Sequence, residues 1–345
     1  MILLKTELYK IWQSHIPVLA IVLLIIVSGL FYGIQAQTDQ DYYQQQYQII
    51  KQESYQIEIE LQLAYLDQST LDRRQTAFLT EYSQQLALYY IQNEETEILP
   101  ILINLDQLRL QGLEAGIDIF GKSSDTINID LARNEILLAK HQNPVIIDNN
   151  LAFYPLIRAF HLQSWSFILL LATVIISVFV FLENEHSATL KSTYSYPYQR
   201  SRIYLAKYFA AFLTSLGIYI LWLGIGWLWL YPHSGVTLAN YPILFDSGYH
   251  CIAILSTIVK QVILADLIMI LAVTALTGFL TVLTFNHSLS LIIALIGGGF
   301  ISGWLFEVSL NTVIRHNALF YLPVIISGIL ISLSFLLISR KDIGF

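Results

Sequence analysis

Residues 183–207 read ENEHSATLKSTYSYPYQRSRIYLAK and lie between two apolar runs, 165–182 and 208–231. Each run is about as long as the 17–25 residues that a helix needs to cross the hydrocarbon core of a bilayer. The stretch between them is short and rich in tyrosine, and its four basic residues are Lys191, Arg200, Arg202 and Lys207. This pattern predicts two membrane-spanning helices joined by a polar loop at one membrane surface. Residues 192–197 end with Pro197 and interrupt the helix, and residues 198–207 are predicted to restart one that leads into the second run.

The composition of the whole chain agrees with a membrane protein. Of its 345 residues, 55% are hydrophobic and 12% are charged, whereas soluble domains have about 25% charged residues. Four further apolar runs complete a set of six predicted spans: 16–34, 262–285, 288–306 and 321–339. The first run is longer than the apolar core of about 7–15 residues in a cleavable signal peptide, and Ile34 stands where the cleavage site needs a small residue. We therefore expect this run to be a retained span.

Residues 35–163 differ from the apolar runs on either side of them. They are rich in Gln, Tyr and acidic residues and contain no apolar run of spanning length. Segments 75–92 and 98–119 place apolar side chains at the spacing of a helix face, and 131–140 does so over a shorter length. The sequence therefore predicts an all-α membrane protein with a mainly helical domain inserted between the first and second spans.

Two further patterns bear on the limits of these helices. Residues 57–63 alternate between apolar and polar, as a strand does, but their flanks are rich in Gln and Glu and lack Gly and Pro, which favours a helix. Gly121 with residues 123–126 predicts one loop, and Asn143 followed by Pro144 predicts another.

At the start of the chain, residues 1–15 place Leu4, Leu8 and Ile11 at helical spacing, with Lys5 and Lys10 between them. This pattern predicts an amphipathic helix that lies along the membrane surface before the first span. The alternative is an ordinary basic flank of that span.

Lysine and arginine in the short loops indicate the orientation of the chain. With the N-terminus inside, the short outer loops hold two basic residues, Lys260 and Arg315. The inner segments then hold eight: Lys5, Lys10, Lys191, Arg200, Arg202, Lys207, Arg340 and Lys341. Basic residues are enriched in cytoplasmic loops, and long domains are left out of the count. We therefore expect both termini and residues 183–207 in the cytoplasm, and residues 35–163 outside.

The charges and motifs exclude several classes of function. Residues 35–160 contain 18 acidic and 8 basic residues, so their net charge is −10, while the whole chain has −7. The rest carries only +3, too little for a nucleic-acid surface. The single cysteine, Cys251, excludes an internal disulfide and a Cys-based metal cluster. No HExxH or GxSxG motif occurs, and the eight histidines, His161 among them, are scattered singly. The letters of the phosphate-binding pattern GxxxxGK[ST] occur once, as GIDIFGKS at 116–123, but they follow a predicted helix, whereas a phosphate-binding loop follows a strand. We expect no catalytic, cofactor or metal site.

Two features within the spans are candidates for function. Asp266 lies one turn inside the fourth span, and ionisable residues at membrane depth are often functional. One interpretation makes it a polar part of a translocation path, and the other makes it a boundary residue that reaches the outer interface. Gly299 and Gly303 form a G-x-x-x-G pair, whose small residues let two helices approach closely, so they are candidates for a subunit contact.

Residues 185–207 resemble the first cytoplasmic loop of ABC-2-type transporter permeases. That pattern has a Glu, then Gly-Thr-Leu-Lys, a Pro, one or two Arg, and a Lys that opens the next helix. The matching residues here are Glu185, Thr189, Leu190, Lys191, Pro197, Arg200 and Lys207, with Arg202 as a further basic residue. Ala188 stands where the family usually has Gly. The segments ELYKIW (7–12) and SRKDIGF (339–345) are also similar to such permeases of low-GC Gram-positive bacteria, as is the arrangement of six spans with a large outer domain.

The resemblance implies a membrane subunit that does not hydrolyse ATP itself. Two copies of a separate ATP-binding cassette ATPase, which bind ATP and Mg, would dock against residues 183–207 and the N-terminal helix. A second permease, identical or homologous, would enclose a path lined by the second and fifth spans. The expected location is the bacterial plasma membrane, and the expected substrates are amphipathic or lipid-like molecules, antimicrobial peptides among them. The alternatives are a membrane sensor with an outer ligand-binding domain, and a membrane scaffold that transports nothing.

Overall fold

The chain folds into two compact units in the computed structural model. Unit 1 consists of residues 1–37, 151–236 and 256–345, and unit 2 consists of residues 38–150 and 237–255. The structure describes residues 2–38, 42–65, 73–91, 98–116, 123–142, 144, 151–163, 165–182, 200–234, 236–246, 250–284, 287–314 and 318–340.

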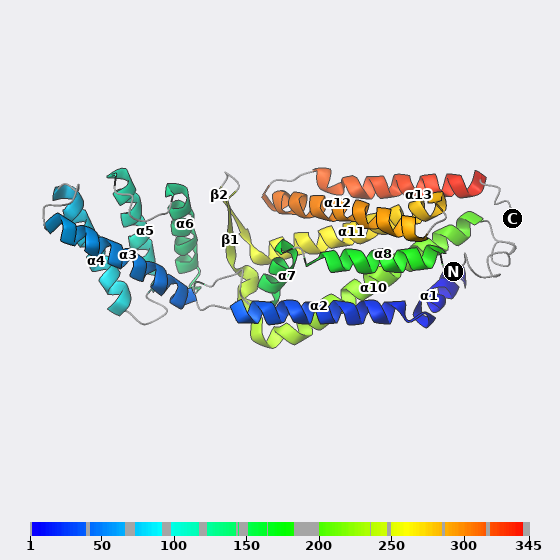
Figure 1. The fold of residues 1–345 in the computed structure, drawn as a ribbon, viewed down its shortest axis with the longest axis horizontal. Coiled ribbons are helices and arrows are strands. Elements are labelled where there is room, and N and C mark those ends of the chain that lie inside the picture. Colours follow the sequence, from blue (N-terminus) through cyan, green and yellow to red (C-terminus); the bar gives the residue numbers. More distant parts are fainter. Residues whose placement is uncertain are drawn as a thin grey trace. The chain divides into compact units, whose positions relative to one another are not determined.

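Unit 1 is a bundle of helices (Figure 1). They are α1 (Ile2–Gln13), α2 (Ile16–Thr38), α7 (Phe153–Leu162), α8 (Phe167–Leu182), α10 (Arg200–Ser234), α11 (Leu255–Thr284), α12 (His287–Ile314) and α13 (Leu322–Arg340), with a 3-10 turn, η2 (Ala318–Tyr321), before α13. Within the described residues, five helices are long and apolar enough to cross a membrane: α2, α10, α11, α12 and α13. The pair α7 and α8, bent by 75°, gives a sixth crossing if it is counted as one span. The chain is therefore a mainly helical, multi-pass membrane protein, as its apolar runs predict.

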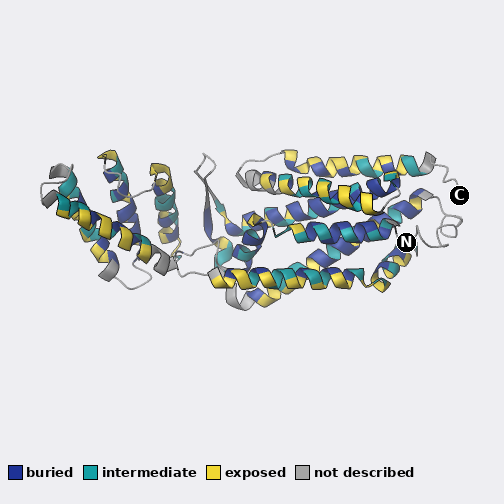
Figure 2. Cartoon of the chain, in the orientation of Figure 1, coloured by how far each residue is buried: buried dark blue, intermediate teal, exposed yellow. Residues whose placement is uncertain are grey.

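Burial differs strongly among these helices (Figure 2). In α11, 67% of the most apolar window is buried inside the protein, against 17% in the last span, at α13. α8 packs against α10 and α12. Two buried threonine hydroxyls of α11 are satisfied locally: those of Thr274 and Thr277 donate to the backbone oxygens of Ile270 and Val273, at 2.7 and 2.8 Å. The apolar side chains exposed on α2, α12 and α13 are those that we expect to contact lipid.

Several basic residues gather at one end of unit 1. The helix α1, the end of α8, the start of α10 and the end of α13 all lie at this end (Figure 1), which we call the basic end. α1 is helical, as predicted, and packs against α10. Its Ile11 is buried, with Leu4 and Leu8 packed against the same apolar core.

The described residues of unit 2 form four α-helices and a β-hairpin. The helices are α3 (Tyr42–Tyr65), α4 (Arg73–Ile91), α5 (Ile98–Glu114) and α6 (Ser124–Ala139). The hairpin consists of β1 (Pro242–Asp246) and β2 (His250–Ile254), which are antiparallel, and it follows a 3-10 turn, η1 (Val236–Asn240). α3, α4 and α5 pack consecutively around an apolar core that contains Ile57, Leu79, Leu86 and Leu105. α6 packs against α5 on one side and also contacts β1.

The hairpin and the limits of unit 2 differ from the sequence prediction. The all-α prediction contained no strands, but the segment between the third and fourth predicted spans forms β1 and β2 and packs on α6. The predicted domain 35–163 also included α7, whereas α7 contacts α10 and belongs to unit 1. The buried residues of α7 include Phe153, Ile157 and Phe160, and this apolar face explains why the helix joins the bundle.

The other predictions for unit 2 have mixed outcomes. The helix favoured over a strand at 57–63 is confirmed, because these residues lie inside α3. The loop predicted at 123–126 is wrong, because α6 begins at Ser124. The hydroxyl of Ser123 accepts a hydrogen bond from the backbone N–H of Thr126 at 3.3 Å, so this stretch is the N-cap of a helix. The helix predicted at 98–119 ends earlier, since Gly116 has a left-handed φ of 79° just after α5.

Candidate functional site

Three buried polar side chains, one each from α7, α10 and α11, meet inside unit 1. Nε2 of His161 on α7 and the hydroxyl of Tyr219 on α10 each lie 2.8 Å from Oδ2 of Asp266 on α11. Nδ1 of His161 lies 2.8 Å from the backbone oxygen of Ile157, one turn earlier. The exposed fractions are 4% for His161, 2% for Tyr219 and 5% for Asp266. We call these three side chains the His–Asp–Tyr cluster.

The geometry of the cluster determines where its protons lie. The backbone oxygen of Ile157 can only accept, so Nδ1 of His161 carries a hydrogen. The contact between Nε2 and Oδ2 of Asp266 also contains a proton, carried either by an imidazolium or by a carboxylic acid. Tyr219 donates its own hydrogen to the same oxygen. In this state His161 and Asp266 together carry no net charge, which burial favours.

Aromatic side chains surround the cluster on the side of α7. The ring of Phe160 meets those of Phe31 and Trp222, with centroids 5.3 Å apart in each case. Trp222 also packs on the ring of Tyr219 and donates its indole N–H to Ser28 at 2.7 Å. These contacts fix α7 against α2 and α10 and keep bulk water away from the polar atoms of the cluster.

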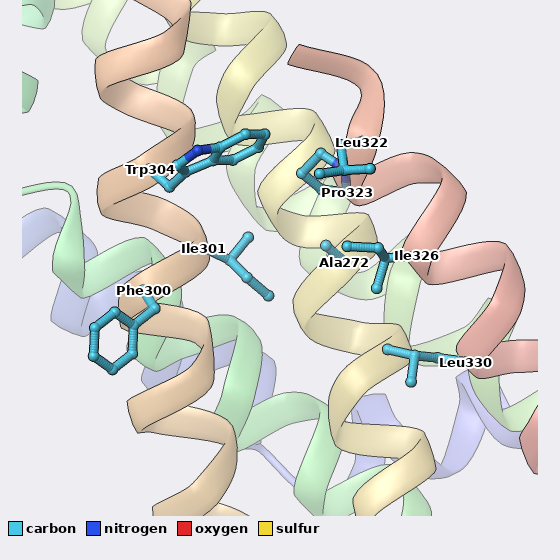
Figure 3. Close-up of a pocket in the computed structure, with 8 residues that line it drawn as sticks. All are labelled: Ala272, Phe300, Ile301, Trp304, Leu322, Pro323, Ile326 and Leu330. Atoms are coloured by element: carbon cyan, nitrogen blue, oxygen red, sulfur yellow. The ribbon is translucent and has the colours of Figure 1, made fainter. Parts of the chain in front are cut away.

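A wholly apolar cavity lies elsewhere in unit 1, between α12 and α13 (Figure 3). It has a volume of about 370 Å³ and is lined by Ala272, Phe300, Ile301, Trp304, Leu322, Pro323, Ile326 and Leu330. Ala272 contributes from α11. A cavity with this lining suits hydrocarbon and offers no group for fixing a charged or strongly polar ligand.

A second buried polar network holds the helices of unit 2 together. The guanidinium of Arg109 on α5 contacts Asp106 at 2.5 Å and Glu53 on α3 at 2.6 Å, and its Nε donates to the hydroxyl of Tyr82 on α4 at 2.9 Å. The same hydroxyl donates to Glu53 at 2.9 Å, and Asn134 on α6 donates to Asp106 at 3.2 Å. All five side chains are buried. The network thus joins all four helices of the unit.

The surroundings of the network shift two pKa values. Burial raises the pKa of the Tyr82 phenol far above its usual value of 10.0, and the charge of Glu53 adds to this effect. For Arg109, burial alone lowers the pKa, but the neighbouring charges of the network, Glu53 and Asp106 among them, raise it above its usual value. Tyr82 therefore stays neutral and Arg109 stays charged, which makes the network an ion-paired structural core for unit 2.

Neither cluster is arranged as a metal centre. In the part of the chain that the structure describes, no group of three His, Cys, Asp or Glu side chains could hold a metal ion.

No family model, curated protein or solved structure matches this chain. What it does is therefore inferred from its residues and their geometry.

Most of the predicted coupling residues lie outside the described part of the chain. These are Glu185, Thr189, Leu190, Lys191 and Pro197. Arg200 begins α10, and Arg202 is exposed in the first turn of that helix. The helix predicted to restart near residue 198 and the span that follows it form one continuous helix, α10.

Lys207, the last of the predicted coupling residues, has a different environment from Arg202. Its side chain is buried, and its ammonium lies 3.5 Å from the backbone oxygen of Phe181 in the last turn of α8. A cation is favourable there because the last carbonyls of a helix carry partial negative charge. Lys207 therefore ties α10 to α8, whereas Arg202 is accessible to a partner.

The remaining predicted residues lie in α11 and α12. An alanine Cβ at Gly299 or Gly303 would meet nothing within 4 Å, so no part of the described chain packs on them. Their role as a subunit contact stays a prediction. Asp266 does not reach outward as a boundary residue does; it is buried and bonded to His161 and Tyr219.

Sequence reasoning missed His161 as a partner of Asp266. The two residues are 105 positions apart, and nothing in a single sequence links them. One signal was present: His161 follows Phe153 and Ile157 at four-residue intervals, so it lies on the apolar face of α7. A histidine on such a face is buried and needs partners for both ring nitrogens.

Proposed function

We propose that this chain is the membrane-spanning subunit of an ABC-2-type exporter in the bacterial plasma membrane, driven by a separate ATPase. The observation that carries the proposal is the basic end of unit 1. There, the ends of α8 and α10 that are joined by the coupling-loop-like segment 183–199 lie beside α1 (Figure 1). Two ATPase copies would dock at this end, and a second permease, identical or homologous, would complete the transport path.

The contacts at the basic end suit the transmission of movement. Exposed Arg202 offers a guanidinium to an acidic partner surface, and Lys207 ties α10 to the last turn of α8. Gly278 of α11 lies directly against the rings of Phe181 and Tyr204, from α8 and α10. A push on the joined ends of α8 and α10 would therefore reach α11 without an intervening flexible side chain.

The two chain segments that pack together in unit 2 support a cytoplasmic position for residues 183–199. Residues 38–150 and 237–255 pack into one unit, so we place both on one side of the membrane. The chain between them must then cross the membrane an even number of times, and α8 and α10 supply two crossings. The segment that joins α8 to α10 then lies on the side opposite to unit 2, which agrees with the orientation expected from basic residues.

Charge reversal at the basic end tests the docking. In the double variant R200E/R202E, we expect the amount of ATPase that co-purifies with the protein to fall at least about tenfold, because the two introduced carboxylates would repel an acidic partner surface. The matched control is K260E, which reverses an exposed cation on the second turn of α11, away from the basic end. The partner to follow is the ATPase encoded beside this protein.

The control variant is expected to retain wild-type co-purification. If K260E and R200E/R202E lowered the amount of co-purified ATPase equally, net charge alone would explain the effect. Arg200 and Arg202 would then not belong to the docking surface. Wild-type retention in both would contradict the docking assignment directly.

The cavity between α12 and α13 supports an amphipathic or lipid-like substrate. Its lining is entirely apolar, and α12 and α13 are both candidate spans, so an alkyl chain could enter without leaving the hydrocarbon layer. Residues 35–160, which contain α3 to α6, add a preference for substrates that carry positive charge elsewhere, since their 18 acidic and 8 basic residues give a net charge of −10.

Filling the cavity tests this assignment. In A272F the added ring occupies the space now lined by Ile301, Trp304 and Ile326, and we expect the affinity for an alkyl-chain probe to fall about tenfold or more. Ile292 is an exposed position on α12 outside the cavity lining, so I292F is the control. Equal affinities in A272F and wild type would rule out the cavity as the alkyl site. A scaffold would bind the ATPase without any stimulation by amphipathic compounds, and a sensor would not bind it.

A further inference from the structure

The His–Asp–Tyr cluster has no part in ATPase docking or in the apolar cavity. Hydrogen bonds between its polar atoms join three helices, and each side chain is almost completely buried. Ionisable groups buried among membrane spans are costly and are retained where they act. We propose that His161, Asp266 and Tyr219 form a proton-binding site, and that the bound proton holds α7 against α10 and α11.

Release of the proton changes the net charge and the hydrogen bonds of the His–Asp–Tyr cluster. With the proton bound, both nitrogens of His161 are hydrogen-bonded and the His161–Asp266 pair is neutral. When the proton leaves to water, the imidazole retains one N–H, which serves either the backbone oxygen of Ile157 or the carboxylate of Asp266, but not both. One bond is lost and the buried cluster gains a net negative charge, which is strongly unfavourable in such surroundings.

Release of the proton also affects α7 itself. With ten residues, α7 is shorter than the roughly 12–15 residues below which an isolated helix is marginal in water, so its position depends on its contacts. These contacts include the aromatic group around Phe160 and the hydrogen bond between His161 and Asp266. Losing one hydrogen bond of His161 while creating a buried charge between α7 and α11 favours separation of the two helices, because separation admits water to the charge.

The other charged and titratable groups on the surrounding helices are few. On α7 they are Arg158, three residues before His161, and Tyr154. On α11 the only one besides Asp266 is Lys260, which is exposed and six residues away. α2 has Tyr32, α8 has none, and α10 has none within two turns of Tyr219. The proton between Nε2 of His161 and Oδ2 of Asp266 is therefore the one that the geometry places inside the cluster.

Hydrogen exchange in the full-length protein in lipid nanodiscs tests the proposal. The readout is the protection of the α7 peptide between about pH 6 and pH 10, after correction for the intrinsic pH dependence of exchange. In the wild type, we expect α7 to exchange about ten to a hundred times faster at the alkaline end than at the acidic end. The α5 peptide of unit 2 is the internal reference, because no residue of the cluster lies on it.

The variant D266N separates proton binding from simple packing. The amide of an asparagine donates one hydrogen to Nε2 of a neutral His161 and the other to the hydroxyl of Tyr219, so both contacts persist without a shared proton. We expect α7 in D266N to stay protected across the alkaline range. In H161A, we expect fast exchange of α7 at every pH.

The outcomes are decisive in either direction. An α7 peptide whose protection in the wild type does not change with pH would overturn the proposal, as would a D266N profile that follows the wild type. If H161A fails to fold, the comparison of D266N with the wild type still decides, because D266N retains the hydrogen bonds. The test requires neither an ATPase nor a substrate, so it stands or falls separately from the exporter assignment.

Discussion

Replacing Arg109 with methionine is expected to destabilise unit 2 by about 3–5 kcal/mol, because two carboxylates, those of Glu53 and Asp106, lose their buried counter-charge. The whole stability of a domain is only about 5–15 kcal/mol. R109M is therefore expected to leave a substantial fraction of unit 2 unfolded in an otherwise inserted protein. Pulse proteolysis of the full-length protein in detergent measures this fraction through cleavage between α3 and α6.

A matched variant is available within the same unit. Arg133 pairs with Asp130 at 3.0 Å, but its side chain is 30% exposed, whereas that of Arg109 is 3% exposed. Exposed pairs contribute about 0–1 kcal/mol, so R133M should resemble the wild type. Equal losses in R109M and R133M would show that burial does not control the effect.

A triple variant distinguishes charge from packing. In E53Q/D106N/R109M the uncompensated carboxylates are gone, and the amides can still donate and accept hydrogen bonds. Replacing a complete buried ionic group is often close to neutral, whereas removing one partner is not. We therefore expect the triple variant to be more stable than R109M, and a triple variant that is less stable would contradict the ion-pair explanation.

Substituting Gly278 with alanine is expected to lower the stability of unit 1, although this exchange normally favours a helix. A Cβ at this position would lie 2.7 Å from Cζ of Phe181 and 2.8 Å from the hydroxyl of Tyr204. The two aromatic rings also contact each other, with centroids 5.4 Å apart, so neither can move without the other. Overpacking of this kind costs about 1–3 kcal/mol, and we expect G278V to be worse than G278A.

The control for Gly278 is Gly224, on α10. A Cβ at Gly224 would meet nothing within 4 Å, so G224A should be neutral or slightly stabilising, by up to about 1 kcal/mol. Thermal unfolding of the purified protein in one detergent compares the two. A wild-type melting temperature for G278A would mean that α8, α10 and α11 are not in close contact at the basic end.

The spans could be predicted because the bilayer imposes a strong and local requirement. A run such as 16–34 must be apolar throughout to cross, and this property is visible in the sequence alone. The start of α10 was also predictable to within a few residues, since Pro197 ends any preceding helix. In unit 2, the spacing of apolar residues gave α4, and the lack of Gly and Pro near 57–63 gave α3.

The parts that could not be predicted depend on contacts between distant segments. His161 and Asp266 are 105 residues apart, and each has an ordinary local environment in the sequence. The strands β1 and β2 have five residues each, too short for a clear periodic signal, and β1 also packs against α6 from a far part of the chain. Ser123 differs from these cases, because its helix-capping role was visible locally and was mistaken for a loop.

The hairpin has a consequence for biogenesis. Unit 2 combines residues 38–150 with residues 237–255, and ribosomes deliver these two segments at different times. Synthesis proceeds from the N-terminus, so α3 to α6 are complete while β1 does not yet exist. The surface of α6 that receives β1 stays uncovered until residues 151–236, which include α8 and the candidate span α10, have also been synthesised. Completion of unit 2 therefore waits for the part of unit 1 that lies between its two segments in the sequence.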